Sequence, residues 1–182
     1  VIFAFPNTYS VGITSLGYQA VWALLVGRSD LTVSRLFTDT ADPLPSNIEI
    51  LGFSLSWELD YAHILDLLEQ RSIPLRAAQR GNQHPLVFGG GPVLSANPEP
   101  FADFFDVILL GDGEELLHQF IDAYQQVRDA PRPIQYRHLA QISGVYIPSL
   151  YEVRYASLDG PIAQIVPFES ETPTKVQKQT YR

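Results

Sequence analysis

The chain of 182 residues lacks cysteine and methionine, and it has only four histidines. Without cysteine there is no disulfide framework, no thiolate metal site and no cysteine nucleophile. The histidines lie far apart, without the spacing of a metal site. No Ser-His-Asp or paired-carboxylate pattern emerges from the spacing either. We therefore predict no catalytic residue and no metal ligand in the chain. The histidines are His63, His84, His118 and His138.

Long hydrophobic runs are also absent. No apolar stretch approaches the roughly 18 residues of a transmembrane helix, and no signal peptide or lipidation motif is visible. We therefore expect a cytoplasmic protein with no membrane partner. The first residue is Val1, inside a strand-like run, and the last two are Tyr181 and Arg182. We expect such a chain to be one domain of a longer protein.

Basic residues are few, with 12 Lys and Arg against 20 Asp and Glu, which gives a net charge of −8. Nucleic-acid binding normally requires a clustered basic face, so no nucleic-acid partner is expected. What the chain does contain is 46% hydrophobic residues, with a mean hydropathy of +0.01. This composition is typical of a globular domain with an ordinary core.

Short apolar runs alternate with helical patterns over the first 130 residues. Nearly continuous apolar runs of this length are typical of parallel strands that are buried on both faces. The pattern predicts an α/β fold, a flavodoxin-like doubly wound parallel sheet with strand order 2-1-3-4-5. The predicted strands span residues 1–5, 31–37, 48–54, 85–89 and 106–110, and the helices span 14–27, 58–71 and 113–128.

The pattern changes after residue 130. A linker-like stretch precedes a helical patch near residues 134–141, and two alternating segments then flank Asp159-Gly160-Pro161 as in a β-hairpin. We predict a flavodoxin-like domain over residues 1–130, a small β-rich extension over 131–168, and a linker over 169–182.

Turns rich in glycine or serine follow four of the predicted strands. Since the carboxyl ends of parallel strands share one edge, these turns are expected to converge on one crevice. Glycine lets a ligand approach the backbone closely, and helix N-termini offer oriented N–H donors. The predicted cofactor-binding residues are Asn7, Tyr9, Gly12, Ser54, Ser56, Gly89, Gly90, Gly91, Gly111 and Gly113.

The turns resemble those of the cobalamin-binding domain that precedes the catalytic core in many radical S-adenosylmethionine (radical SAM) enzymes. That signature is Asp-x-His-x-x-Gly, then Ser-x-Leu and Gly-Gly. Here Gly12 and Ser54 are separated by 41 residues, as in the family, and Gly89-Gly90 supplies the diglycine. Residues 111–115 are similar to a Gly-Glu-Gly-Glu stretch of such domains. Residues 5–12, 52–55, 89–92, 97–100 and 144–149 resemble more closely a bacterial subfamily of uncharacterised radical SAM proteins.

The resemblance implies a cobalamin whose dimethylbenzimidazole tail enters a slot beside the first strand. In the family, the signature histidine coordinates cobalt from below. Tyr9 replaces this histidine and Asn7 replaces the aspartate. A phenol with a pKa near 10 is not a routine neutral ligand. We therefore expect cobalamin to be bound without a protein histidine. The resemblance also implies a following radical SAM domain, joined in the same chain, that binds a 4Fe-4S cluster and S-adenosylmethionine, neither of which this segment can hold.

Two alternatives remain open. The domain could be a cofactor-free interaction or substrate-gating module of the same enzyme. This alternative is favoured because Tyr9 replaces the signature histidine and Ser56 replaces the leucine of Ser-x-Leu. It could instead bind a flavin or nucleotide at the same edge. Against the latter, there is no Gly-x-Gly-x-x-Gly fingerprint and no phosphate-cradling Ser/Thr cluster after the first strand.

Overall fold

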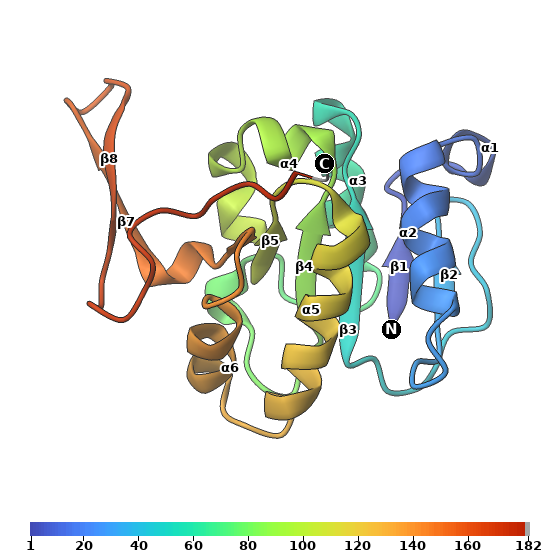
Figure 1. The fold of residues 1–182 in the computed structure, drawn as a ribbon. Helices are drawn as coiled ribbons and strands as arrows, with labels where there is room; N and C mark the ends of the chain where they lie inside the picture. The colour runs from blue at the N-terminus through green and yellow to red at the C-terminus, as the bar shows by residue number, and fades with distance from the viewer. Residues whose placement is uncertain (181–182) are drawn as a thin grey trace.

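A computed structural model describes residues 1–180 and contains one large, mostly parallel sheet (Figure 1). Its strand order is β2-β1-β3-β4-β5-β6, in which the first five strands are parallel and β6 runs antiparallel to β5. The predicted order 2-1-3-4-5 is confirmed, and β6 extends it by one strand. The strands are β1 (Ile2–Ala4), β2 (Ser34–Leu36), β3 (Ile50–Ser54), β4 (Leu86–Gly90), β5 (Val107–Leu109) and β6 (Val145–Tyr146).

Helices cover both faces of this sheet and make a three-layer α/β fold. One face packs against α2 (Leu16–Val26), α5 (Gly113–Val127) and α6 (Arg132–Leu139). The other face packs against α3 (Tyr61–Glu69) and α4 (Pro92–Ala96). Strand residues therefore point alternately into two apolar cores, as expected for a sheet that is buried on both sides.

Local sequence explains where the main helices begin. Ser15 caps α2, where its hydroxyl accepts a hydrogen bond from the Tyr18 N–H at 3.4 Å. Helix α5 carries Glu114 and Glu115 in its first turn, where the helix dipole favours acidic groups. Its buried stripe then repeats at helical spacing, through Leu116, Leu117, Phe120, Ile121 and Tyr124.

Several short elements were not predicted. Helix α1 (Tyr9–Gly12) and α4 each contain only a turn or so, too short for a periodic pattern. The predicted helix over 58–71 is divided into a 3-10 turn, η1 (Glu58–Asp60), and α3. The other 3-10 turns are η2 (Ala77–Gln79), η3 (Glu99–Phe104) and η4 (Pro148–Leu150). The connection over residues 28–47 contains no helix.

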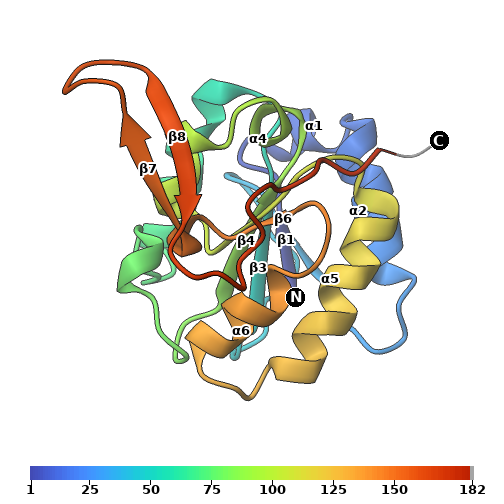
Figure 2. The same cartoon turned by 60° about the vertical axis from the view of Figure 1, so that its left-hand side comes forward.

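The predicted hairpin is present as β7 (Tyr151–Tyr155) and β8 (Ile162–Pro167), which pair antiparallel and project from the body of the molecule (Figure 1). After the hairpin, the chain returns across the carboxyl edge of the large sheet towards the start of α5 (Figure 2). Within the predicted linker, Thr172 is buried, Val176 packs against the core, and Gln179 is hydrogen-bonded to residues that follow β5. Residues 181–182 lie outside the described part, and the three-part domain division remains a prediction.

A buried ion pair joins β5 to its surroundings. Asp106 and Arg80 have fully buried side chains, with Nη1 of Arg80 3.0 Å from Oδ2 of Asp106. The same Oδ2 accepts from the Val87 N–H at 2.8 Å, and Oδ1 accepts from the Tyr136 hydroxyl at 2.6 Å. Burial, reinforced by Asp106, raises the pKa of Tyr136 far above its ordinary value. This network fastens α6 and the 74–80 loop to the sheet.

Candidate functional site

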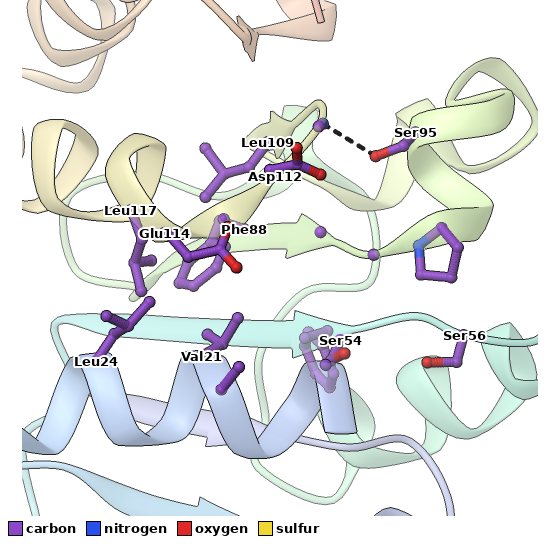
Figure 3. A pocket seen from close by; sticks show the side chains of 18 of the residues that line it. Val21, Leu24, Ser54, Ser56, Phe88, Ser95, Leu109, Asp112, Glu114 and Leu117 are labelled. Carbon is purple, nitrogen blue, oxygen red and sulfur yellow. Dashed lines mark hydrogen bonds between the residues drawn. The ribbon is translucent and has the colours of Figure 1, made fainter. Parts of the chain in front are cut away.

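A cleft of about 320 Å³ opens between α2 and α5, at the carboxyl ends of the parallel strands (Figure 3). This edge is where open α/β sheets place their ligands. Figure 3 shows Val21 and Leu24 of α2 on one wall, facing Leu117 of α5 on the other. The cleft is lined by Phe3, Gly17, Ala20, Val21, Leu24, Phe53, Ser54, Ser56, Phe88, Gly90, Gly91, Pro92, Ser95, Leu109, Gly111, Asp112, Gly113, Glu114, Leu117 and Lys178.

The position of the α2 wall is set by Tyr18, which is completely buried under the helix. Its ring stacks on Phe3 at a centroid distance of 4.9 Å, and its hydroxyl donates to the Phe3 carbonyl at 3.2 Å. Burial raises the pKa of Tyr18 well above its ordinary value, so the hydroxyl stays a donor. Because Tyr18 points into the core, Gly17 and Ala20 are left on the cleft side of α2.

The glycines of this region fall into two groups. A Cβ added at Gly17 would meet nothing within 4 Å, and at Gly90 and Gly113 it would meet protein atoms no closer than 3.9 and 3.4 Å. Packing of the protein therefore does not require glycine at these three positions. The space that they leave open belongs to the cleft, which is the arrangement expected where a ligand approaches the backbone.

At other positions the fold itself requires glycine. Gly91 and Gly111 have φ values of +112° and +113°, and a Cβ would lie 2.5 Å from the Leu55 oxygen and 1.9 Å from the Gln179 oxygen, respectively. Both line the cleft, but their backbone conformation alone accounts for the residue type.

The polar groups of the cleft are three serines and three charged residues. Ser95 holds the Gly111 turn, because its hydroxyl accepts from the Gly111 N–H at 3.0 Å. Ser54 is the last residue of β3, and Ser56 lies just after it. The charged residues are Asp112, Glu114 and Lys178. The cleft thus combines apolar walls with a few hydroxyl and charged groups, the usual make-up of a small-molecule site.

Six of the ten predicted cofactor residues lie together in this cleft. They are Ser54, Ser56, Gly90, Gly91, Gly111 and Gly113. Gly89 lines the opposite face of the sheet, where a Cβ would come within 2.5 Å of Leu94 and 2.7 Å of Phe105. Tight packing against α4 therefore accounts for this glycine.

The opening turn lies outside the cleft. Asn7 donates from Nδ2 to Asp60 at 3.0 Å, and the Tyr9 ring packs edge-on against Phe37 at a centroid distance of 5.2 Å. Gly12 is buried, and a Cβ there would approach the same Phe37 ring to 2.6 Å. These three predicted residues therefore contact other parts of the protein and do not line the cleft. Packing against Phe37 accounts for Tyr9 and Gly12.

The nearest histidine to the opening turn is His63, whose Nδ1 lies 2.9 Å from the Pro6 carbonyl oxygen and 3.8 Å from Oδ1 of Asp60. This contact ties the start of α3 to the turn after β1. Within residues 1–180, no three His, Cys, Asp or Glu side chains lie close enough together to hold a metal ion. Likewise, no helix in this range is long and apolar enough to cross a membrane.

Sequence reasoning missed the apolar walls and the charged groups. One stripe of α2 has a signal in the sequence, because its cleft-lining residues recur at the spacing of a helix face: Gly17, Ala20 and Leu24. This stripe could have been recognised as a second face of the helix, beside the one that carries Tyr18. Lys178 had no such signal, because it lies in a polar tail without periodicity.

An open, mostly parallel α/β sheet with a cleft at its carboxyl edge defines a doubly wound ligand-binding domain. The family model described as the N-terminal region of radical SAM proteins matches residues 33–148, more than half of the chain. The chain therefore belongs to this family. The match includes the turns after β3, β4 and β5, but it excludes the opening turn, α2 and Lys178.

The chain is also similar to an uncharacterized protein of Methanocaldococcus jannaschii, with 26% identity over 114 residues. The alignment covers 63% of this chain and 24% of the relative, so the chain spans about a quarter of that protein's length. No solved structure matches. The expected radical SAM N-terminal domain is thus confirmed, whereas the cobalamin-binding type, the bacterial origin and the cytoplasmic location stay predictions.

Proposed function

We propose that this domain is the cobalamin-binding accessory domain of a radical SAM enzyme and holds a corrinoid in the cleft between α2 and α5. The observation that carries the proposal concerns Gly17, Gly90 and Gly113. Each position has room for a Cβ, so the packing of the protein does not require glycine there, and the open space beside these residues belongs to the cleft. An apolar slot with small residues suits a flat aromatic group such as the dimethylbenzimidazole tail.

The residues present fit such a tail without a histidine ligand. Val21, Leu24 and Leu117 would contact the aromatic rings, and the hydroxyls of Ser54 and Ser56 would hydrogen-bond the polar part of the tail. Tyr9 and Asn7 are engaged by Phe37 and Asp60 and do not line the cleft. The protein would therefore bind the corrinoid through its tail and leave cobalt without a ligand from the opening turn.

The chemistry that a bound corrinoid supplies is the carriage of a methyl group, and the role of this chain is to bind and orient it. Membership of the family implies a radical SAM domain in the same polypeptide, and that domain would hold the 4Fe-4S cluster and S-adenosylmethionine. Exposed apolar side chains adjoin the cleft: Leu16 precedes Gly17, and Trp57 follows Ser56. These side chains offer a surface on which the radical SAM domain would dock.

The cofactor-free interaction module remains the second candidate, because the replaced signature residues Tyr9 and Asn7 make contacts that stabilise the fold itself. A flavin or nucleotide in the same cleft is the third. Ser54, Ser56 and the glycine turns would line the site in that case too. The three candidates differ in what the purified protein retains.

Reconstitution with hydroxocobalamin tests the proposal. The full chain should keep corrin absorbance after desalting, and Ala20→Phe, which fills the cleft from α2, should lose it. Ala23→Phe is the matched control, because Ala23 is exposed on the same helix and does not line the cleft. No retained absorbance in the unmodified chain would refute cobalamin binding and favour the interaction module. Yellow colour and flavin fluorescence would favour the third candidate.

A further inference from the structure

Residues 172–180 form a strap that crosses the carboxyl edge of the sheet and ends beside the cleft (Figure 2). Its start is fixed, because Thr172 is buried and the Pro173 carbonyl accepts a hydrogen bond from the Tyr151 hydroxyl at 2.8 Å. Val176 then packs against the core on the α3 side of the sheet. The strap is therefore part of the folded domain over its whole described length.

Gln179 latches the strap onto the turn after β5. Its N–H donates to the Leu110 carbonyl at 3.0 Å, and its own carbonyl accepts from the Asp112 N–H at 3.0 Å. Its side-chain Nε2 donates to the Ser143 carbonyl at 3.2 Å. These bonds place the strap alongside Gly111 as a short parallel bridge.

Two glycines give this latch its shape. Gly111 and Gly144 have positive φ values of +113° and +87°. A Cβ at Gly111 would lie 1.9 Å from the Gln179 oxygen, and one at Gly144 would lie 2.8 Å from the Gln179 Cγ. A side chain at either position would collide with the strap as well as strain the backbone. The turn after β5 is thus fitted to receive Gln179.

The latch brings Lys178 to the cleft. Lys178 is the only cationic residue among those of the described chain that line it, and the other charged lining residues, Asp112 and Glu114, are acidic. None of the ion pairs among residues 1–180 involves Lys178. Among the lining residues that the structure describes, Lys178 is therefore the one that offers a positive charge to an anionic group in the cleft.

We propose that Lys178, positioned by the Gln179 latch, binds the phosphodiester of the ligand's nucleotide tail. An ammonium is a compact point charge with three donors, well suited to phosphate oxygens. The carboxylate of Glu114 would accept a hydrogen bond from a sugar hydroxyl, and the apolar walls would hold the base. The site thus recognises a base, a sugar and a phosphate together, and it is complete only with the strap in place. This inference rests on the proposed corrinoid function.

The test compares hydroxocobalamin with cobinamide, which lacks the phosphate, sugar and base, by absorbance titration of the full chain. The unmodified chain should bind cobalamin more tightly than cobinamide. Lys178→Gln should weaken cobalamin binding about tenfold and leave cobinamide binding unchanged, since one charge-assisted contact is lost. Lys178→Arg should restore most of the affinity. Lys175→Gln is the control, because Lys175 is exposed on the same strap and does not line the cleft.

Equal cobalamin affinity in Lys178→Gln and the unmodified chain would overturn the assignment of Lys178 while leaving the proposed function intact. An equal loss for both corrinoids would also overturn it, because the effect would not depend on the phosphate. If the unmodified chain binds neither corrinoid, the proposed function fails, and the inference fails with it.

The latch itself has a readout that needs no ligand. Gly111→Ala should increase hydrogen exchange of the Gln179 amide, whereas Gly113→Ala, which has room for the added methyl group, should not. Gly111→Ala should also weaken cobalamin binding as much as Lys178→Gln does. Unchanged exchange in Gly111→Ala, measured on a chain that melts as cooperatively as the unmodified one, would contradict the latch.

Discussion

The substitution Asp106→Asn would isolate the charge of the buried ion pair from its hydrogen bonds. An asparagine oxygen can still accept from the Val87 N–H and the Arg80 guanidinium, and its amide can donate to the Tyr136 hydroxyl oxygen. What is lost is the negative charge that faces a fully buried cation. Breaking a buried pair from one side costs about 3–5 kcal/mol.

Arg80 keeps three carbonyl acceptors in the variant, on Pro74, Leu75 and Phe104. These hydrogen bonds compensate part of the unpaired charge, so we expect the lower end of the range, about 3 kcal/mol. With a urea m-value of about 2 kcal/mol/M, the unfolding midpoint should fall by roughly 1.5 M at constant m.

The control is Asp103→Asn, which removes the carboxylate of an exposed pair with Arg76. Both side chains of that pair are more than half exposed, so its loss should cost less than about 1 kcal/mol. If urea denaturation gives Asp106→Asn the same small loss of stability as Asp103→Asn, the charge of the buried pair does not stabilise the fold.

Three further substitutions test the local structure. Gly17→Ala should stabilise the chain by roughly 0.5 kcal/mol in thermal unfolding, because α2 gains helix propensity and the added methyl group meets no protein atom within 4 Å. Gly12→Ala should instead lower the melting temperature, because its Cβ would lie 2.6 Å from Phe37; an unchanged melting temperature would contradict this close packing. Burial acts to raise the pKa of Asp42, but hydrogen bonds from the Arg35 backbone and side chain outweigh it and hold the pKa below its ordinary value. This contribution to stability is present above the unfolded pKa and is lost as the pH falls through the lower, folded pKa. Asp42→Asn should therefore reduce the loss of stability that occurs as the pH falls below about 4. An unaltered pH profile of stability in Asp42→Asn would contradict this role.

The strand order could be predicted because each strand is a short apolar run, and the rules for crossovers leave few topologies. The same reasoning placed Ser54, Ser56 and the turns after β4 and β5 at one edge, where the cleft lies. The two-residue strand β6 is too short to produce a pattern, and its pairing depends on a tertiary contact between Ile108 and Tyr146.

The opening turn was assigned to the site because its sequence resembles a signature, but its side chains are engaged elsewhere. Phe37, about 25 residues further along the chain, accounts for the packing of both Tyr9 and Gly12. No local pattern in the sequence reveals such a long-range partner. Lys178 was missed for the same reason, since only the contact between Gln179 and Gly111 brings it to the cleft.

The shortness of β6 also bears on where the strands of this domain could pair with another chain. A strand with a free edge is a template for pairing with another chain, and very short edge strands are one protection against it. At one border of the large sheet, β6 offers only two residues, and at the other, the three residues of β2 are partly covered by a bridge between Leu36 and Ala41. Within the described residues, the longer free edges belong to the hairpin of β7 and β8. Among the described strands, those of the hairpin therefore offer the most backbone for edge-to-edge pairing with another chain.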